Sequence, residues 1–231
     1  MWLNKYLNID IFVLSVFIVS LCFLLDSIYI DTEMLMTPMI SYENIENIAQ
    51  TGDLVIFRWN TIDIGFRLFS KFSHVGMIVK QKGKLYLLEI HPKEIPESDI
   101  DNSGVHLYHL KPRLDEYNGT YYFTQLNTSD SIREKLGKYI LNNLKKYKKN
   151  IPFDMNFRNI FVVNYFYNLF NIKLPKRKAM FCSEFIGTIL DKCKIYKHYK
   201  NISSINPGTF LEFKKKNGTS VYGPLYNILI S

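Results

Sequence analysis

The chain has 231 residues, of which 47% are hydrophobic, 22% charged and 15% aromatic. This composition excludes an intrinsically disordered chain, a collagen-like repeat and a polytopic membrane protein. The 29 lysine and arginine residues exceed the 21 aspartate and glutamate residues, which gives a net charge of +8. No nucleic-acid-reading motif accompanies this charge, so nucleic acid is not an expected partner. The length suits one domain with an appendage.

Residues 11–25 form an uncharged apolar run, IFVLSVFIVSLCFLL, between Asp10 and Asp26. A helix needs about 20 apolar residues to cross a bilayer, and no small-x-small cleavage site follows the run. We therefore predict that residues 1–30 are a transmembrane helix that anchors the chain, with a cleaved signal peptide as the alternative. Because Lys5 precedes the run and acidic residues follow it, the positive-inside rule places the N-terminus in the cytosol and the domain across the membrane.

Residues 31–50 are predicted to be a linker with a short helix at 42–49, and residues 51–231 to be the folded domain. Alternating apolar residues bounded by turn residues predict strands within this domain, and Lys82-Gly83 predicts a two-residue hairpin turn. The predicted strands are 54–59, 74–80, 85–91, 105–110 and 121–126, and the predicted helices are 61–72, 129–150, 159–170 and 182–192.

The predicted helix 129–150 is amphipathic, and Ser129 or Asp130 is available as its N-cap. Its apolar residues are spaced by four, as expected for one buried face of a helix. The opposite face is rich in lysine, which is typical of a solvated surface, with phosphate or lipid binding as the alternative. The apolar stripe consists of Ile132, Leu136, Ile140 and Leu144.

Two short segments contain residue types suited to nucleophilic catalysis: SHVGM around His74 and FCSEF around Cys182. An apolar stripe follows Cys182 at helical spacing, which places this cysteine in the first turn of a helix. There the helix dipole favours a thiolate, and a neighbouring imidazolium favours it further. A lone cysteine is more often a small buried apolar residue, so the catalytic interpretation requires a partner.

The predicted hairpin supplies His74 as that partner. With a two-residue turn, the sequence numbers of any two residues that face each other across the hairpin add up to 165. Gly76 then faces Glu89, and His74 faces His91, all on one side of the sheet. Glu89 lies diagonally within reach of His74 and is predicted to orient its ring, with His91 as the rival. Gly76 is predicted to leave room beside the imidazole.

The order of these pieces resembles the circularly permuted papain-like cysteine hydrolases, a superfamily that includes bacterial YiiX-type and NlpC-like proteins, poxviral relatives and the lecithin:retinol acyltransferase group. The resemblance covers about residues 50–210. It implies an α+β fold, in which a small antiparallel barrel-like sheet packs on the cysteine-bearing helix. It also implies that Cys182 is the nucleophile, His74 the general base and Glu89 the third member of a triad. The segments that carry the resemblance are 52–53, 73–76, Glu89, 152–154 and 181–185.

The predicted function is that of a thiol hydrolase, an amidase or peptidase that acts through an acyl-enzyme. A lipid-directed acyltransferase or phospholipase of the same fold and a non-catalytic membrane-tethered scaffold are the alternatives. The expected partners are the membrane, through the N-terminal helix, and a peptide, amide or lipid-ester substrate. No cofactor or metal is expected, because Cys182 and Cys193 lie about 16 Å apart along one helix, too far for a shared zinc ion.

Overall fold

The computed structural model divides the chain into two compact units, Met1–Thr37 and Pro38–Ser231. The structure describes residues 21, 34, 36–59, 71–91, 104–154, 179–196, 202, 205–215 and 217–230. Apart from Leu21, the predicted anchor at residues 1–30 lies outside this set, as do residues 61–70 and the predicted helix 159–170. Among the helices in the described ranges, none combines the length and the apolar character needed to cross a bilayer.

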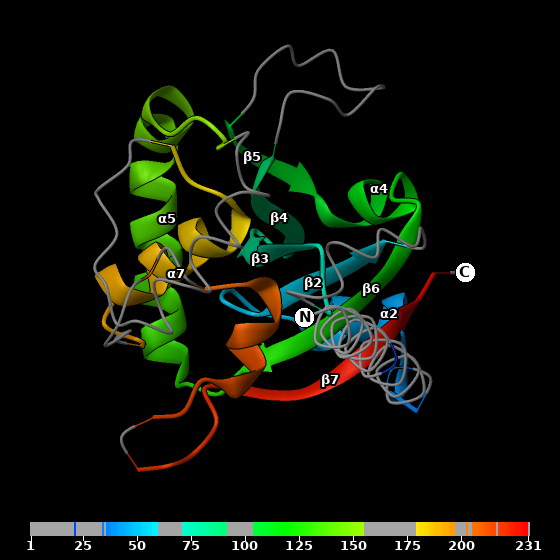
Figure 1. The fold of residues 1–231 in the computed structure, drawn as a ribbon. Coiled ribbons are helices and arrows are strands. Elements are labelled where there is room, and N and C mark those ends of the chain that lie inside the picture. Colours follow the sequence, from blue (N-terminus) through cyan, green and yellow to red (C-terminus); the bar gives the residue numbers. More distant parts are fainter. Residues whose placement is uncertain are drawn as a thin grey trace, which may run out of the picture. The chain divides into compact units, whose positions relative to one another are not determined.

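The second unit is built on a seven-stranded sheet with the order β1-β7-β6-β2-β3-β4-β5 (Figure 1). The pairing of β1 with β7 is parallel, and all the other pairings are antiparallel. The mixed α+β class and the largely antiparallel sheet therefore agree with the sequence analysis. The strands are β1 (Met39–Ser41), β2 (Leu54–Trp59), β3 (His74–Gln81), β4 (Lys84–His91), β5 (Gly104–His109), β6 (Gly119–Leu126) and β7 (Tyr222–Leu229).

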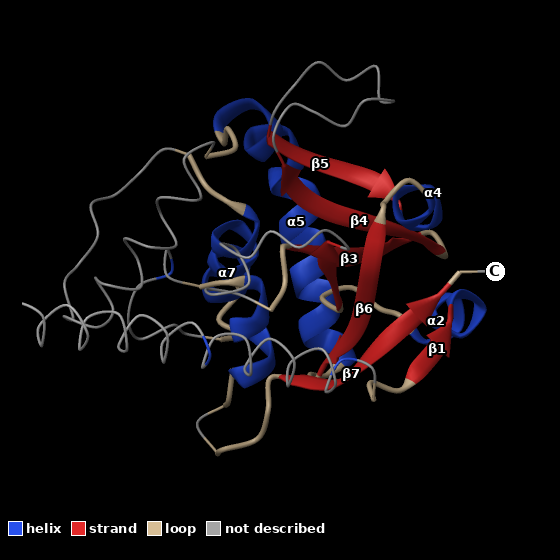
Figure 2. Cartoon of the chain, turned by 45° about the vertical axis from the view of Figure 1, so that its right-hand side comes forward, coloured by secondary structure: helices blue, strands red, loops and turns tan. Residues whose placement is uncertain are grey.

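Helices cover both sides of this sheet, with α5 and α7 on one side and α2 and α4 on the other (Figure 2). The α2 and α4 side encloses a cluster of buried apolar residues that includes Ile45, Val55 and Leu87. Because both faces are covered, the central strands are buried almost throughout. The helices are α2 (Tyr42–Ile48), α4 (Leu110–Asp115), α5 (Asp130–Asn150), α7 (Cys182–Lys192) and the 3-10 helix η2 (Pro207–Glu212).

The predicted hairpin of β3 and β4 is confirmed with its register. Lys82 and Gly83 both have positive φ angles, 50° and 78°, as a two-residue turn of the primed type requires. Met77 pairs with Leu88, and the ladder continues to the turn in the predicted register. The predicted linker needs correction, because α2 and β1 are part of the folded unit and the side chains of Ile45 and Ala49 are fully buried.

Helix α5 is present with the expected bounds, but the buried stripe differs from the predicted one. Ile132 is 38% exposed, whereas Arg133, Leu136 and Ile140 are buried. The reason is an ion pair between Arg133 Nη1 and the buried Asp53 carboxylate, 2.7 Å from nitrogen to oxygen, which turns position 133 toward the sheet. Arg133 therefore occupies the buried position that the spacing of apolar residues assigned to Ile132.

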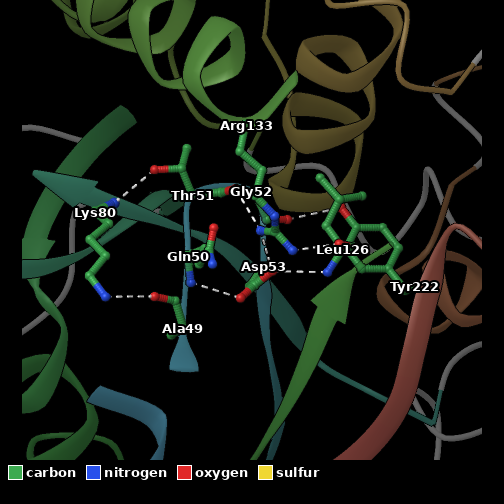
Figure 3. A network of polar contacts seen from close by, with 9 residues as sticks. All are labelled: Ala49, Gln50, Thr51, Gly52, Asp53, Lys80, Leu126, Arg133 and Tyr222. Atoms are coloured by element: carbon green, nitrogen blue, oxygen red, sulfur yellow. Dashed lines mark hydrogen bonds and ion pairs between the residues drawn. The ribbon is translucent and has the colours of Figure 1, made fainter. Parts of the chain in front are cut away.

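Asp53 is the centre of a polar network that joins β2 to β6 and α5 (Figure 3). Its Oδ1 accepts the backbone N–H of Leu126 at 2.9 Å, and its Oδ2 accepts the N–H of Gln50 at 2.9 Å. Arg133 also donates to the carbonyl oxygens of Thr51 and Leu126. These bonds satisfy a carboxylate that has no solvent contact, and so they fix the start of β2.

Replacing Arg133 by methionine is expected to lower the free energy of unfolding by about 3–5 kcal/mol, because Asp53 is then a buried charge without its cation. Urea denaturation measures the difference. Lys138→Met on the same helix removes an exposed ion pair with Glu134 and should cause no measurable change. Equal losses in the two variants would contradict the role given to Asp53 and Arg133.

Candidate active site

His74 and Glu89 are in direct contact across the β3–β4 hairpin. The distance from His74 Nε2 to Glu89 Oε2 is 2.7 Å, with the side chain of His74 13% exposed and that of Glu89 fully buried. Burial acts to raise the pKa of Glu89, but the hydrogen bond from His74 and the charge of Arg113 outweigh it and hold the pKa at about 2. An ionised carboxylate only accepts hydrogen bonds, so Nε2 carries the hydrogen and Nδ1 is left for another partner.

Arg113 binds the same carboxylate from α4 and was not identified from the sequence. Its Nε donates to Glu89 Oε1 at 2.5 Å, and its Nη2 donates to Oε2 at 3.3 Å. The guanidinium lies 5.4 Å from the ring centroid of Phe57 and 5.8 Å from that of Tyr117. One sequence signal was available: Leu110, Arg113 and Leu114 have the i, i+3, i+4 spacing of a buried helix face, and all three are buried.

Cys182 is the first residue of α7 and is 5% exposed. Its side chain is within hydrogen-bonding contact of His74 and affects the protonation of that ring. Burial alone would lower the pKa of His74, but Cys182 and then Glu89 favour the charged imidazole and raise the pKa to about 9. His74 therefore stands between a thiol and a carboxylate, and it is positioned to exist as an imidazolium at neutral pH.

Backbone bonds hold the segment that leads into Cys182. Phe153 and Met180 form a parallel bridge, the N–H of Asp154 donates to the Met180 carbonyl at 3.0 Å, and the N–H of Met180 donates to the Pro152 carbonyl at 3.2 Å. Residues 152–154, one of the segments that carry the resemblance, thus lie beside the chain just before α7. No side-chain hydrogen bond caps this helix at Phe181.

His91 and Gly76, which the sequence analysis places beside His74, make other contacts in the structure. His91 Nε2 lies 2.8 Å from the Tyr108 hydroxyl, and the His91 ring stacks on His106 with centroids 4.5 Å apart, so the carboxylate of Glu89 is the described partner of His74 Nε2. Gly76 does not make room for the imidazole. A Cβ at this position would lie 2.7 Å from Leu87 Cδ1, and the space left by the glycine therefore accommodates Leu87.

Cys193 caps the far end of α7, and burial raises the pKa of its thiol to about 11. The two cysteines therefore stand at opposite ends of one helix and do not share a site. Within the described ranges, no three His, Cys, Asp or Glu side chains are placed to hold a metal ion.

No protein-family model matches the chain. The chain is 27% identical over 187 residues to an uncharacterized protein of Acanthamoeba polyphaga mimivirus, a match that covers 71% of this chain and 74% of that one. Among solved structures, it is similar to the metalloprotein YiiX of Escherichia coli O157:H7, with a TM-score of 0.40 and 18% identity over 77% of this chain and 87% of that one. Neither comparison confirms a permuted papain-like fold or a catalytic triad.

Iodoacetamide at pH 6 is expected to modify Cys182 well before Cys193. An ordinary thiol with a pKa near 8.5 is almost wholly protonated at this pH, and the pKa of Cys193 is raised further, whereas an imidazolium adjoins Cys182. Peptide mass spectrometry over a time course measures the two rates. His74→Ala should slow the modification of Cys182 and leave that of Cys193 unchanged; slow and equal rates in the native protein would refute the assignment.

The stabilising effect of His74 is expected to depend on pH in a defined direction. The folded-state pKa, about 9, is above the ordinary value of 6.5, so the stabilisation is complete below pH 6.5 and is lost as the pH rises through 9. The pKa of Glu89 is lowered, so its contribution is present above pH 4.5 and is lost as the pH falls through 2. The difference in unfolding free energy between the native protein and His74→Ala should be constant from pH 5 to 6.5 and then shrink; a difference independent of pH up to 9 would contradict this.

Proposed function

We propose that the chain is a cysteine-dependent hydrolase of amide or ester bonds, with Cys182 as nucleophile, His74 as general base and acid, and Glu89 as the residue that orients His74. The observation that supports this most directly is that Cys182 lies close enough to His74 to favour its charged form, while Nε2 of the same ring lies 2.7 Å from a buried carboxylate. A nucleophile, a base and an orienting group in this sequence of contacts form the arrangement used for acyl transfer.

In the acylation half of the proposed mechanism, the Cys182 thiolate attacks the substrate carbonyl, and a carbon–sulfur bond forms. The negative charge moves to the carbonyl oxygen, and N–H groups in the first turn of α7 would stabilise it. The bond to the leaving amine or alkoxide then breaks, and the leaving group takes the proton from His74 Nδ1. His74 is neutral in the resulting thioester, and its Nε2–H still donates to Glu89.

In the deacylation half, water attacks the thioester carbonyl and gives a proton to His74 Nδ1. The carbon–sulfur bond breaks, the carboxylic acid leaves, and the thiolate–imidazolium pair is restored. An acyltransferase would follow the same path with an acceptor hydroxyl or amine in place of water. The N-terminal apolar run favours substrates at a membrane, and we propose that residues 1–30 anchor the domain there.

A chromogenic ester such as p-nitrophenyl acetate tests this function without knowledge of the natural substrate. We expect a rapid release of nitrophenol equal to the enzyme concentration, with one acetyl group on Cys182 in the mass spectrum. The Cys182→Ala variant should show neither the release nor the adduct, and Cys193→Ala should behave as the native protein does. A native protein that gains no acetyl group on Cys182 would refute the proposal.

The same assay distinguishes Glu89 from His91 as the orienting residue. Glu89→Gln should reduce turnover by about 10-fold or more, because the neutral amide does not stabilise the imidazolium. His91→Ala should cost less, since His91 bonds to Tyr108 and stacks on His106. The reverse order would support the two-histidine pattern of the acyltransferase alternative.

A further inference from the structure

We propose that Arg113 is a positioning residue for deacylation: it keeps Glu89 ionised while His74 is neutral in the acyl-enzyme. This inference rests on the proposed function and adds a fourth group to the three assigned above. Arg113 acts through Glu89, because its Nε and Nη2 bonds go to the two carboxylate oxygens and leave the second lone pair of Oε2 for His74.

The geometry fixes the direction in which Glu89 presents its oxygens. Oε1 accepts the shorter bond from Arg113, at 2.5 Å, while Oε2 accepts His74 Nε2 at 2.7 Å and the longer Arg113 bond at 3.3 Å. A planar guanidinium bound through two nitrogens sets the plane of the carboxylate. The rings of Phe57 and Tyr117 lie against the guanidinium and limit its movement. The carboxylate is therefore held with one oxygen aimed at the imidazole.

The charges along this chain of contacts change during the proposed cycle. In the resting enzyme, the thiolate, imidazolium, carboxylate and guanidinium alternate in sign, so Glu89 has two cationic neighbours. In the acyl-enzyme, the thiolate is consumed and His74 has given up its proton, and Arg113 is then the cation that remains bound to Glu89. Glu89 is fully buried, and burial favours its protonated form. Loss of Arg113 would therefore affect this intermediate more than the resting enzyme.

Among the residues that the structure describes, Arg113 and His74 are the cations that lower the pKa of Glu89. His106 is the cross-strand partner of Glu89 on β5, and its ring packs against those of His91 and Tyr108. Tyr117 follows α4, and burial raises the pKa of its phenol to about 12, so it is neutral over the working range. Once Glu89 is protonated, it no longer offers a negative charge to the imidazolium that forms, and proton uptake by His74 from water becomes inefficient.

Rapid-mixing measurements with p-nitrophenyl acetate separate the two halves of the reaction in Arg113→Met, Arg113→Lys and the native protein. We expect the acylation burst of Arg113→Met to stay within about 3-fold of the native rate, while the later steady-state rate falls by about 10-fold or more. The loss should be largest at low pH and should diminish as rising pH ionises Glu89. Arg113→Lys keeps the charge and should retain more of the deacylation rate. Lys111→Met, on the same helix but half-exposed, should leave both rates unchanged.

A double variant guards against a purely structural effect of leaving Glu89 unpaired. In the Glu89→Gln background there is no buried carboxylate for Arg113 to keep ionised, so adding Arg113→Met should change deacylation by less than about 2-fold. Equal losses of acylation and deacylation in Arg113→Met, or additive losses in the double variant, would overturn the inference while leaving the triad intact. Failure of the native protein to form the Cys182 adduct would instead refute the proposed function itself.

Discussion

The burial of the Glu89 carboxylate is the constraint around which the candidate site is arranged. None of its side chain is exposed, and an unpaired charge in such a place costs several kcal/mol. Three elements meet this demand together: β4 carries Glu89, β3 brings His74 and α4 brings Arg113. The same pairing that makes the burial tolerable also holds the imidazole with one nitrogen turned toward the carboxylate. The electrostatic requirement and the geometry of the proposed catalytic residues are thus satisfied by one set of contacts.

The parts of the site that follow local rules could be predicted from the sequence. A two-residue turn at Lys82 and Gly83 fixes the register of its hairpin, and strand alternation then decides which side chains share a face. This is enough to bring His74 to Glu89. The helix that begins at Cys182 was also predictable, because its apolar residues repeat at helical spacing over eleven residues.

The parts that depend on distant segments could not be predicted. Arg113 and Arg133 are charged residues, which are assumed to be exposed unless a partner is known. Their partners lie in other segments, Glu89 on β4 and Asp53 just before β2. Strand β1 is only three residues long, too short to show an alternation of apolar and polar residues. Its partner, β7, lies near the other end of the chain, and the pairing is parallel, so no local turn signals it. Gly76 was expected to serve His74, although the side chain that fills its space, Leu87, comes from the neighbouring strand.

Two arginine–carboxylate pairs are buried in the described part of the chain, and they differ in their surroundings. The Arg133–Asp53 pair joins structural elements, whereas the Arg113–Glu89 pair lies in the candidate active site. Asp53 receives hydrogen bonds from Arg133 and from the backbone N–H groups of Gln50 and Leu126, none of which changes protonation at neutral pH. The charges around Asp53 therefore stay the same near neutral pH, which suits a network that holds β2, β6 and α5 together. Glu89 has one partner that never loses its charge, Arg113, and one that does, His74. A carboxylate held firmly on one side and bound to a titratable ring on the other can stabilise an imidazolium when it forms and retain its own charge when the proton leaves.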